Sequence, residues 1–421
     1  MESRINDSKR KRVVVVGGSI AGLCCAHSLL RSEWLEVLVF ERARSVTAAG
    51  AGLGVGPRAC DALRSWGLGD ALESSSLPLS MEENRALDSK RNDPVVIKDE
   101  TYDHRAVHWS DLHRLIHDAL PAGIVRWSHE VVSFAELREA NGEPRVRVKV
   151  SKLGGAENES NVEEIDADFM VSADGSMSQT REKFIPNESR RYSGYCAWRG
   201  VLETSSEHAQ EVAETVKKAY PDLGKCLYFD IAEGTHAGLY ELLKKRLNWL
   251  WYINQPEPQL KGKSVTLKAD EKAIKELHEQ AQRTWPPELA KLMQSTASPF
   301  INAIFDREPL GQFVWGRVVL VGEAAHPTTP HGLRSTNMSI DDAFVLGNAI
   351  AKWGPDQIEV ALDEYQGERV PAATREVLFS RHLGKLKQGL LIPGIDWLQA
   401  EQNLKEQLLQ KNVHSFQPSE L

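Results

Sequence analysis

A glycine-rich turn between an apolar strand and a helix is the feature that most restricts the fold of this chain. The stretch from Val13 to Gly22 reads VVVVGGSIAG, a β-branched run followed by the start of an apolar helix pattern. A pyrophosphate site has this arrangement, because Gly17 permits a tight turn and Gly22 lets helix and strand approach closely. The helix N-terminus then offers N–H groups to the phosphates. We therefore expect a dinucleotide-binding βαβ unit at the start of the chain.

Such a unit needs an acidic residue, and one follows the next apolar run. Glu41 follows Val37–Phe40, where a carboxylate can accept hydrogen bonds from the ribose hydroxyls of an adenosine. Ser19 replaces the second glycine of the usual pattern, and a side chain this small is tolerated there. The residues expected to bind the cofactor in this unit are Gly17, Gly18, Ser19, Ile20, Ala21, Gly22, Glu41 and Arg42.

The later patterns predict that this first domain is interrupted. A helix is expected from Pro57 to Gly67, another over Asp111–Leu120 with Ser110 as its cap, and a hairpin that starts with Arg145–Ser151. Further expected elements are the strand Phe169–Ser172 that closes the hairpin, aromatic strands at Tyr192–Leu202, Lys225–Ile231 and Leu247–Ile253, helices at Asp270–Arg283 and Pro287–Met293, a buried strand at Arg317–Val321, a long helix after Pro330, two helices between about 355 and 388, and a polar tail from about 395.

Charge and cysteine usage exclude several classes of protein. A net charge of -8 over 421 residues gives no overall field that attracts nucleic acid, and no run approaches the roughly 20 apolar residues of a membrane span. The five cysteines form neither a CxxC pair nor a disulfide framework, and no metal site is expected. The strand at Val13 leaves no room for a cleavable signal ahead of it, so a cytoplasmic location is expected.

Two further motifs make the prediction specific. The sequence from Asp174 to Arg181 reads DGSMSQTR, and Gly322–Pro327 reads GEAAHP ahead of Pro330-His331-Gly332. In this order, the three motifs resemble those of the flavoprotein aromatic hydroxylases, the family of p-hydroxybenzoate hydroxylase and salicylate hydroxylase. The resemblance runs from about residue 12 to 385. The segments Tyr192–Gly200 and Asn248–Tyr252 most resemble the branch that contains 2,6-dihydroxypyridine 3-monooxygenase.

The resemblance implies an α/β fold, a Rossmann-like FAD-binding domain with an inserted, mostly antiparallel β-sheet substrate domain. The implied FAD domain comprises residues 12–75, 101–185 and 301–388, the substrate domain residues 76–100 and 186–300, and a C-terminal tail residues 389–421. The implied enzyme is a monooxygenase, a monomer or homodimer, that uses FAD and either NADH or NADPH. It inserts one atom of O2 into a small aromatic or heteroaromatic substrate through a flavin C4a-hydroperoxide.

The resemblance also assigns roles to residues of the later motifs. It places Gly322-Glu323 at the ribityl chain and pyrophosphate, Asp174-Gly175 at the boundary of FAD and NAD(P)H, and the turn after Pro330 at the pyrimidine edge of the flavin. Backbone donors at a helix N-terminus would stabilise the anionic reduced flavin there. The cofactor-binding residues implied are Trp109, Asp174, Gly175, Gly322, Glu323, Pro330, Gly332, Leu333, Arg334, Ser335, Thr336 and Asn337.

Three positions depart from the family pattern. The family usually has Asp at Glu323, Arg at Trp109, and Gly-Gln-Gly near Leu333-Arg334-Ser335, where Arg334 would add positive charge beside a flavin anion. These departures keep two alternatives open. One is an epoxidase or oxidase on the same scaffold, and the other is a flavin-binding protein with little turnover.

The candidates for substrate chemistry are Pro330, His331, Trp198 and Arg199. His326 is expected to serve packing and hydrogen bonding, whereas His331 suits a structural and a proton-relay role about equally. Arg199 either orients an anionic or phenolic substrate or pairs with an acid, and the sequence favours the second. Two or three of the following aromatic residues are expected to face a ligand, and the others to fill the sheet core: Tyr195, Trp198, Tyr228, Tyr240, Trp249, Trp251 and Tyr252.

Overall fold

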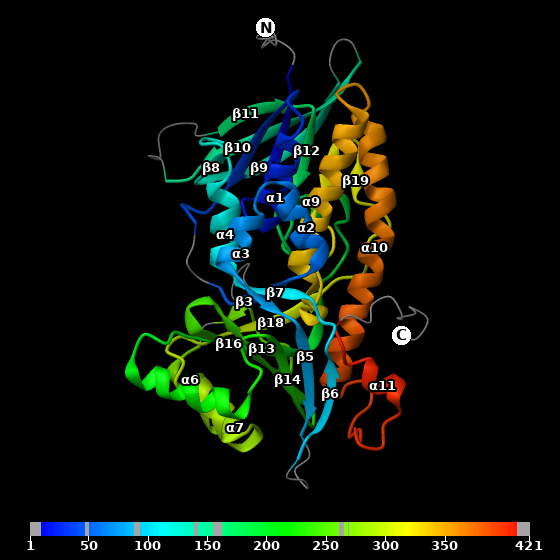
Figure 1. Ribbon diagram of the computed structural model, residues 1–421. Coiled ribbons are helices and arrows are strands. Elements are labelled where there is room, and N and C mark those ends of the chain that lie inside the picture. The colour runs from blue at the N-terminus through cyan, green and yellow to red at the C-terminus, as the bar shows by residue number, and fades with distance from the viewer. Residues whose placement is uncertain are drawn as a thin grey trace.

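Two large β-sheets form the body of the molecule, and helices cover each of them (Figure 1). The computed structural model describes residues 10–46, 50–87, 93–138, 142–154, 162–260, 265–267 and 269–410. Figure 1 shows the six-stranded sheet in the upper half and the eight-stranded sheet in the lower half, with one long helix running past both. Within the described residues, no helix combines the length and apolar character that a bilayer crossing requires.

The six-stranded sheet has the order β19-β20-β12-β1-β2-β8, and only its β19–β20 pair is antiparallel. The residues of β12 and β20 are all buried, as expected for continuous apolar runs in the middle of a parallel sheet. Because β20 comes from the last third of the chain, the predicted return to the first domain is confirmed. The strands span β1 Lys11–Val16, β2 Leu35–Glu41, β8 Val125–Trp127, β12 Phe169–Ser172, β19 Val314–Trp315 and β20 Val318–Leu320.

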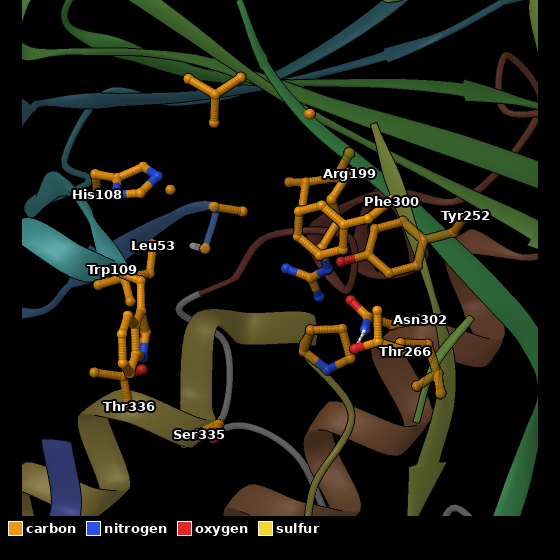
Figure 2. Close-up of a pocket in the computed structure, with 18 of the residues that line it drawn as sticks. Leu53, His108, Trp109, Arg199, Tyr252, Thr266, Phe300, Asn302, Ser335 and Thr336 are labelled. Atoms are coloured by element: carbon orange, nitrogen blue, oxygen red, sulfur yellow. Dashed lines mark hydrogen bonds between the residues drawn. The ribbon is translucent and has the colours of Figure 1, made fainter. Parts of the chain in front are cut away.

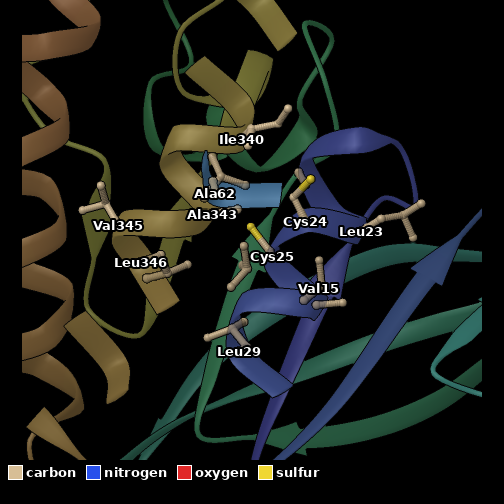
Figure 3. Close-up of a cluster of buried hydrophobic side chains, with 14 of the residues drawn as sticks. Val15, Leu23, Cys24, Cys25, Leu29, Ala62, Ile340, Ala343, Val345 and Leu346 are labelled. Carbon is tan, nitrogen blue, oxygen red and sulfur yellow. The ribbon is translucent and has the colours of Figure 1, made fainter. Parts of the chain in front are cut away.

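Helices α1 and α9 pack together over one face of this sheet (Figure 3). Cys24 and Cys25 of α1 are free and fully buried among Ala343 and Leu346 of α9, so their thiols act as small apolar groups. Gly347 permits the contact, since a Cβ there would lie 1.9 Å from the hydroxyl of Ser28. The helices of this part of the chain are α1 Ile20–Leu30, α2 Pro57–Ser65, α3 Gly69–Ser75, α4 Trp109–Asp118, α5 Gln179–Phe184, α9 Arg334–Trp353 and α10 Ile358–Lys387.

A three-stranded antiparallel sheet, β11-β10-β9, covers the opposite face. The predicted hairpin is therefore confirmed, and its strands span β9 His129–Arg138, β10 Pro144–Lys152 and β11 Val162–Ala167. The prediction that Phe169–Ser172 closes this hairpin is wrong. These four residues are buried on both faces, and they pair in parallel with β1 and β20 instead.

The eight-stranded sheet has the order β17-β18-β13-β16-β15-β14-β5-β6 and is antiparallel except for the β14–β5 pair. Its strands span β5 Met81–Ala86, β6 Val95–Asp99, β13 Arg191–Leu202, β14 Cys226–Ala232, β15 Thr235–Leu242, β16 Arg246–Asn254, β17 Thr266–Leu267 and β18 Phe300–Asp306. Helices α6 Glu207–Ala219, α7 Glu271–Thr284 and α8 Pro287–Gln294 pack on one of its faces.

A small sheet lies between the two large ones. It has the order β3-β7-β4, with strands β3 Gly52–Val55, β4 Leu77–Leu79 and β7 His104–His108. The Rossmann-type domain with a separate sheet domain is the predicted fold class, which is confirmed. The exact domain division stays a prediction. Sheet membership groups residues 81–99 with 191–306, so we propose that the substrate domain extends to the end of β18.

Two details of the helices differ from the predictions. Ser110 does not cap α4, because His108 occupies the cap position and its Nδ1 accepts a hydrogen bond from the Ser110 backbone N–H at 3.2 Å. One helix of 30 residues, α10, replaces the two expected between about 355 and 388. Pro371 removes a hydrogen bond from its middle, but Tyr365 and Ala373 on either side are buried against the core, and this packing continues the helix.

Part of the predicted polar tail packs against the rest of the molecule. A short helix, α11 Gln402–Glu406, follows Trp397, and Leu408 and Leu409 are buried behind it. These side chains pack with Ile97 and Ile231 of the eight-stranded sheet. The predicted polar tail therefore contains a packed part, formed by Trp397, Leu408 and Leu409, while residues 411–421 lie outside the described part of the chain.

The contact between β1 and α1 makes a direct prediction. A Cβ on Gly22 would lie 1.9 Å from the carbonyl oxygen of Gly17, so Gly22→Ala should push strand and helix apart and yield insoluble or flavin-free protein. Gly311→Ala is the control, because no atom lies within 4 Å of a Cβ there. Soluble yield and the absorbance of bound flavin measure the outcome. A yellow, soluble Gly22→Ala protein would contradict this placement of the turn.

Candidate functional site

The glycine-rich turn is built for close backbone contact. Gly17 has φ 103°, and a Cβ there would lie 2.4 Å from the carbonyl oxygen of Ala173. Ser19 occupies the N-cap of α1 but its side chain makes no capping hydrogen bond. The N–H groups of Ile20 and Ala21 in the first turn therefore remain available to an anion. A pyrophosphate fits this cradle.

Glu41 lies against the same turn. Its Oε2 accepts a hydrogen bond from the Gly18 N–H at 2.7 Å, and its Oε1 accepts one from the Ala43 N–H at 2.7 Å. Each oxygen keeps a further lone pair for a ribose hydroxyl. Arg42 is exposed and points to no partner among the described residues.

A cavity of about 1230 Å³ lies between the two large sheets (Figure 2). It exceeds the roughly 300–1000 Å³ of a pocket for one drug-sized ligand, so it has room for a cofactor ring and a substrate together. The turn at Gly17–Gly22 and Glu41 do not line it. The predicted cofactor residues thus form two groups, one beside β1 and one around the cavity. Those that line the cavity are Trp109, Glu323, Pro330, Leu333, Arg334, Ser335 and Thr336.

Gly322 joins the third motif to the first. With φ 59° it lies so near α1 that a Cβ would come 2.9 Å from the Cβ of Ala21. Its N–H donates to Oδ2 of Asp342 at 2.7 Å. The adjacent Glu323 lines the cavity and accepts a hydrogen bond from the Ser335 hydroxyl at 2.7 Å. This hydrogen bond holds the Glu323 carboxylate at the N-terminus of α9, which follows the turn after Pro330.

A buried ionic cluster supports this corner. Asp342 contacts Nε2 of His326 at 2.5 Å and Nε of Arg369 at 2.7 Å. Burial raises the pKa of Asp342, but His326, Arg369 and the Gly322 N–H outweigh it and lower this pKa to about 2. Asp342 therefore stays ionised at every working pH. His326 is 2% exposed and has the packing and hydrogen-bonding place expected of it.

Asp174 and Gly175 lie just beyond the cavity wall. Asp174 accepts hydrogen bonds from the Ser172 hydroxyl at 2.5 Å and from the Thr180 N–H at 3.3 Å, and Gly175 has φ 79°. Only the following residue, Ser176, lines the cavity. The carboxylate of Asp174 thus shapes the turn, and any contact with NAD(P)H stays a prediction.

The turn from Pro330 to Asn337 has an unusual backbone. Gly332 and Leu333 have φ 73° and 56°, and α9 begins immediately afterwards at Arg334. The Asn337 side chain donates to the carbonyl oxygens of Gly54 at 2.9 Å and Leu333 at 2.6 Å. Asn337 therefore links the turn to β3. Its side-chain amide, which was predicted to contact the cofactor, is used in these two hydrogen bonds.

Arg334 does not present a free charge to the cavity. Its Nε lies 3.0 Å from Oε2 of Glu376, its Nη2 donates to the carbonyl of Gln410, and its guanidinium lies over the ring of Phe379. The positive charge expected of Arg334 therefore lies at the cavity wall, but Glu376 pairs with it.

Trp109 stands where the family usually has arginine. It begins α4 and lines the cavity, where its ring stacks on His113 with centroids 4.8 Å apart. A Cβ on Gly50 would lie 3.0 Å from the Cβ of Trp109. At this position an aromatic face replaces a guanidinium.

Trp198 and Arg199 point to opposite faces of β13, as the period of a strand predicts. Trp198 is buried in the core with α8 and does not line the cavity. Arg199 lines the cavity, and among the described residues no carboxylate forms an ion pair with it. Its buried Nε has no hydrogen-bond partner. The interpretation of Arg199 as half of an ion pair is therefore not supported.

The cavity wall around Arg199 is aromatic and polar. Figure 2 shows the Tyr252 hydroxyl turned towards Arg199, with Phe300 beside them and Asn302 below. The amide nitrogen of Asn302 donates to the Thr266 hydroxyl at 2.8 Å. Of the seven aromatic candidates, only Tyr240 and Tyr252 line the cavity, which agrees with the expected two or three.

Sequence reasoning missed β3 and the polar residues of β17 and β18. The signal for β3 is visible in the alternating glycines at 50, 52, 54 and 56. A Cβ on Gly52 would lie 2.7 Å from the Tyr240 hydroxyl, and one on Gly54 would lie 2.5 Å from Leu333. Asn302, Thr266 and Phe300 have no comparable local signal, because strand pairing brings them to the cavity. Thr266 of β17 lies opposite Asn302 of β18, and Phe300 of β18 lies opposite Arg199 of β13.

His331 lies behind the cavity in a hydrogen-bonded chain. Nδ1 of His236 lies 2.6 Å from the amide oxygen of Gln388, whose nitrogen donates to Asn254 at 2.8 Å. His236 must therefore carry its proton on Nδ1. Its bare Nε2 faces Nε2 of His331 at 3.2 Å, so His331 donates there and accepts from the Tyr195 hydroxyl at 3.4 Å. This order fixes both tautomers when both rings are neutral.

Burial keeps both rings neutral. It lowers the pKa of His331 well below 6.5, and His236, Lys387 and Arg199 lower it further. Burial and Lys387 likewise lower the pKa of His236. His331 itself does not line the cavity, so the geometry supports a role in holding the turn.

Comparison with known proteins was made on sequence and on structure. A family model described as an FAD binding domain matches residues 10–380. The 6-hydroxynicotinate 3-monooxygenase of Pseudomonas fluorescens is 26% identical over 374 residues, which cover 87% of this chain and 90% of the relative. A salicylate hydroxylase substrate complex superposes with a TM-score of 0.75 at 22% identity, covering 98% and 97% of the two chains. The 2,6-dihydroxypyridine-3-hydroxylase of Arthrobacter nicotinovorans gives 0.73 at 22% identity, covering 90% and 93%.

Glu41 allows a test of the adenosine end of the site. Glu41→Ala should weaken binding of FAD much more than binding of FMN, because FMN lacks the adenosine ribose that this carboxylate would contact. Fluorescence titration of the apoprotein with each flavin measures the difference. Equal losses for the two flavins would contradict the assignment.

The histidine pair makes a prediction about pH. Since both folded-state pKa values lie below 6.5, the unfolded chain takes up protons first as pH falls, and the free energy of unfolding should decrease below about pH 6.5. His236→Gln should reduce this slope by up to about 1.4 kcal/mol per pH unit, the value for one proton. Urea unfolding between pH 5 and 7 tests it, and an unchanged slope would show that His236 is protonated in the folded protein.

Proposed function

Since the chain belongs to the family of FAD-dependent aromatic-ring monooxygenases and FAD is its cofactor, we propose that its substrate is a small aromatic or heteroaromatic ring with an anionic substituent. Residues 10–380 match the family model, so membership covers both the glycine-rich turn and the cavity. FAD, when bound, supplies the electron transfer from NAD(P)H and the activation of O2. The protein supplies binding, orientation and exclusion of water.

The guanidinium of Arg199 is the observation that carries the proposal. It borders the cavity without an acid in ion-pair range among the described side chains, as does Arg190, whose guanidinium lies over the Phe305 ring. A cation left unpaired beside an apolar wall is costly, whereas an anionic ligand would compensate it with charge-assisted hydrogen bonds. A carboxylate or phenolate on the ring meets this need, and the Tyr252 hydroxyl beside Arg199 can donate to the same group.

The rest of the cavity suits a flat ring. Phe300, Tyr240 and Tyr252 offer faces and edges for aromatic contact. Relatives of this chain have names that specify hydroxylated aromatic acids, such as 6-hydroxynicotinate and salicylate. We infer that the acid group lies at Arg199, and that the ring extends from there towards Pro330 and the residues of the predicted flavin site.

We assign the cofactor contacts on the same basis. Gly17 to Gly22 and Glu41 would hold the ADP half, and Glu323 with the turn from Pro330 to Thr336 would border the flavin ring. Pro330 borders the cavity. His331 lies outside the cavity and supports the turn through its hydrogen bond to His236. Trp198 has no such role, because it lies on the far face of the sheet.

Oxygen incorporation tests the proposal. With FAD bound, NAD(P)H oxidation should be slow alone and should accelerate with a hydroxylated aromatic or pyridine carboxylate, and label from ¹⁸O₂ should enter the product. Arg199→Met should raise KM for the carboxylate by about tenfold to a hundredfold, the loss of a charged hydrogen bond, with little effect on an uncharged analogue of the same ring.

Trp198→Phe is the control, since it changes the neighbouring residue on the other face of the strand. Equal effects of Arg199→Met on both analogues would refute the anionic substrate. Flavin reduction without label in any product would favour an oxidase, and no response to any aromatic compound would favour a flavin-binding protein with little turnover.

A further inference from the structure

The end of the described chain reaches the flavin-facing turn. The C-terminal segment, residues 397–410, runs past the edge of the eight-stranded sheet, and Leu408 at its end is 0% exposed. Side chains of this segment pack with Ala86, Ile97 and Leu386. His382 of α10 adds a hydrogen bond to the Gln407 side chain at 3.0 Å. The segment is thus part of the packed structure.

Gln410 forms two backbone hydrogen bonds that point in different directions. Its N–H donates to Oε2 of Glu82 at 2.9 Å, and its carbonyl accepts from Nη2 of Arg334. Glu82 is fully buried at the start of β5, where Asn84 donates to its other oxygen at 2.9 Å. The same Asn84 accepts from the buried ammonium of Lys387 at 2.9 Å. One residue therefore links the substrate sheet to the helix that follows the turn.

The turn needs such a support. Leu333 has φ 56°, a region that is unfavourable for a branched side chain and persists only when surrounding contacts enforce it. Its side chain lies close to Gly54 and borders the cavity. Arg334, the next residue, has its guanidinium held by the Gln410 carbonyl, by Glu376 and by the ring of Phe379. These contacts hold the first turn of α9, and with it the strained backbone of Leu333.

From this geometry we infer that Arg334 is a positioning residue, and that the C-terminal segment sets the flavin-facing turn through the bond between Gln410 and Arg334. The family pattern has Gly-Gln-Gly near this position, whereas this chain has Leu333-Arg334-Ser335. In this chain the hydrogen bond from the Arg334 side chain to Gln410 thus takes the place of the flexible glycine backbone. The inference rests on the proposed placement of this turn at the flavin, and it does not depend on which ring is hydroxylated.

Thermodynamic linkage makes the inference testable in the full-length protein. If the segment orders the turn that binds FAD, FAD must order the segment by the same factor. Hydrogen–deuterium exchange of the peptide that covers 397–410 should slow by about tenfold when FAD is added. In Arg334→Met this protection should disappear and FAD should bind about tenfold more weakly, while Arg334→Lys should restore part of both effects.

A second pair of variants tests the link from the other end. Leu408→Ala loosens the segment without touching the turn, and Leu277→Ala removes the same atoms from a buried site on α7. At similar losses in Tm, Leu408→Ala should weaken FAD binding about tenfold and Leu277→Ala less than twofold. If removing FAD unfolds the chain, the rate of FAD release from the loaded protein gives the same comparison.

Three outcomes would overturn the inference. They are unchanged FAD affinity in Arg334→Met, FAD-dependent protection of residues 397–410 that survives this substitution, and equal effects of Leu408→Ala and Leu277→Ala. None of these measurements involves substrate turnover. Failure of the inference is therefore distinct from failure of the proposed function, which would appear in the ¹⁸O₂ experiment.

Discussion

Close approach of backbone at one point organises the molecule. The carbonyl of Gly17 lies where a Cβ of Gly22 would be, the carbonyl of Ala173 lies where a Cβ of Gly17 would be, and Gly322 lies against Ala21. Three segments that are more than a hundred residues apart in the chain converge there, with only small side chains such as that of Ala21 between them. Because hydrogen-bonded backbone and a helix N-terminus meet at this point, it can hold a phosphate, and it also fixes where the two later motifs must lie.

The charges of the site follow from this convergence. Gly322 donates to Asp342, and the Asp342 cluster with His326 and Arg369 holds the third motif against α9. These buried charges are balanced, and Arg334 is balanced by Glu376. Among the described residues, Arg199 and Arg190 differ because both border the cavity without such a partner. The distribution therefore assigns most charges to structure and leaves these two guanidinium groups for a ligand.

The sequence predicted what depends on local pattern. The turn at Gly17–Gly22, the parallel strand that ends at Glu41 and the return of β20 are local signals, since short side chains and continuous apolar runs have few other uses. The length of α10 could not be predicted in this way, because Pro371 is tolerated only through packing on both sides. Likewise β15 and α6 were not foreseen, and neither was the cap formed by His108. Each of these depends on a tertiary partner rather than on its own residues.

The same limit explains why the role of Arg334 could not be predicted. At the level of sequence, an arginine in a flavin-facing turn indicates a charge beside the flavin. In the folded chain its guanidinium contacts Gln410, which lies seventy-six residues further on. The family's glycines would give this turn its shape through backbone freedom, and Leu333 has no such freedom at φ 56°. A turn with a branched residue in this conformation needs an external constraint. The packed segment 397–410 provides one, which accounts for a departure from the family pattern that would otherwise suggest a damaged site.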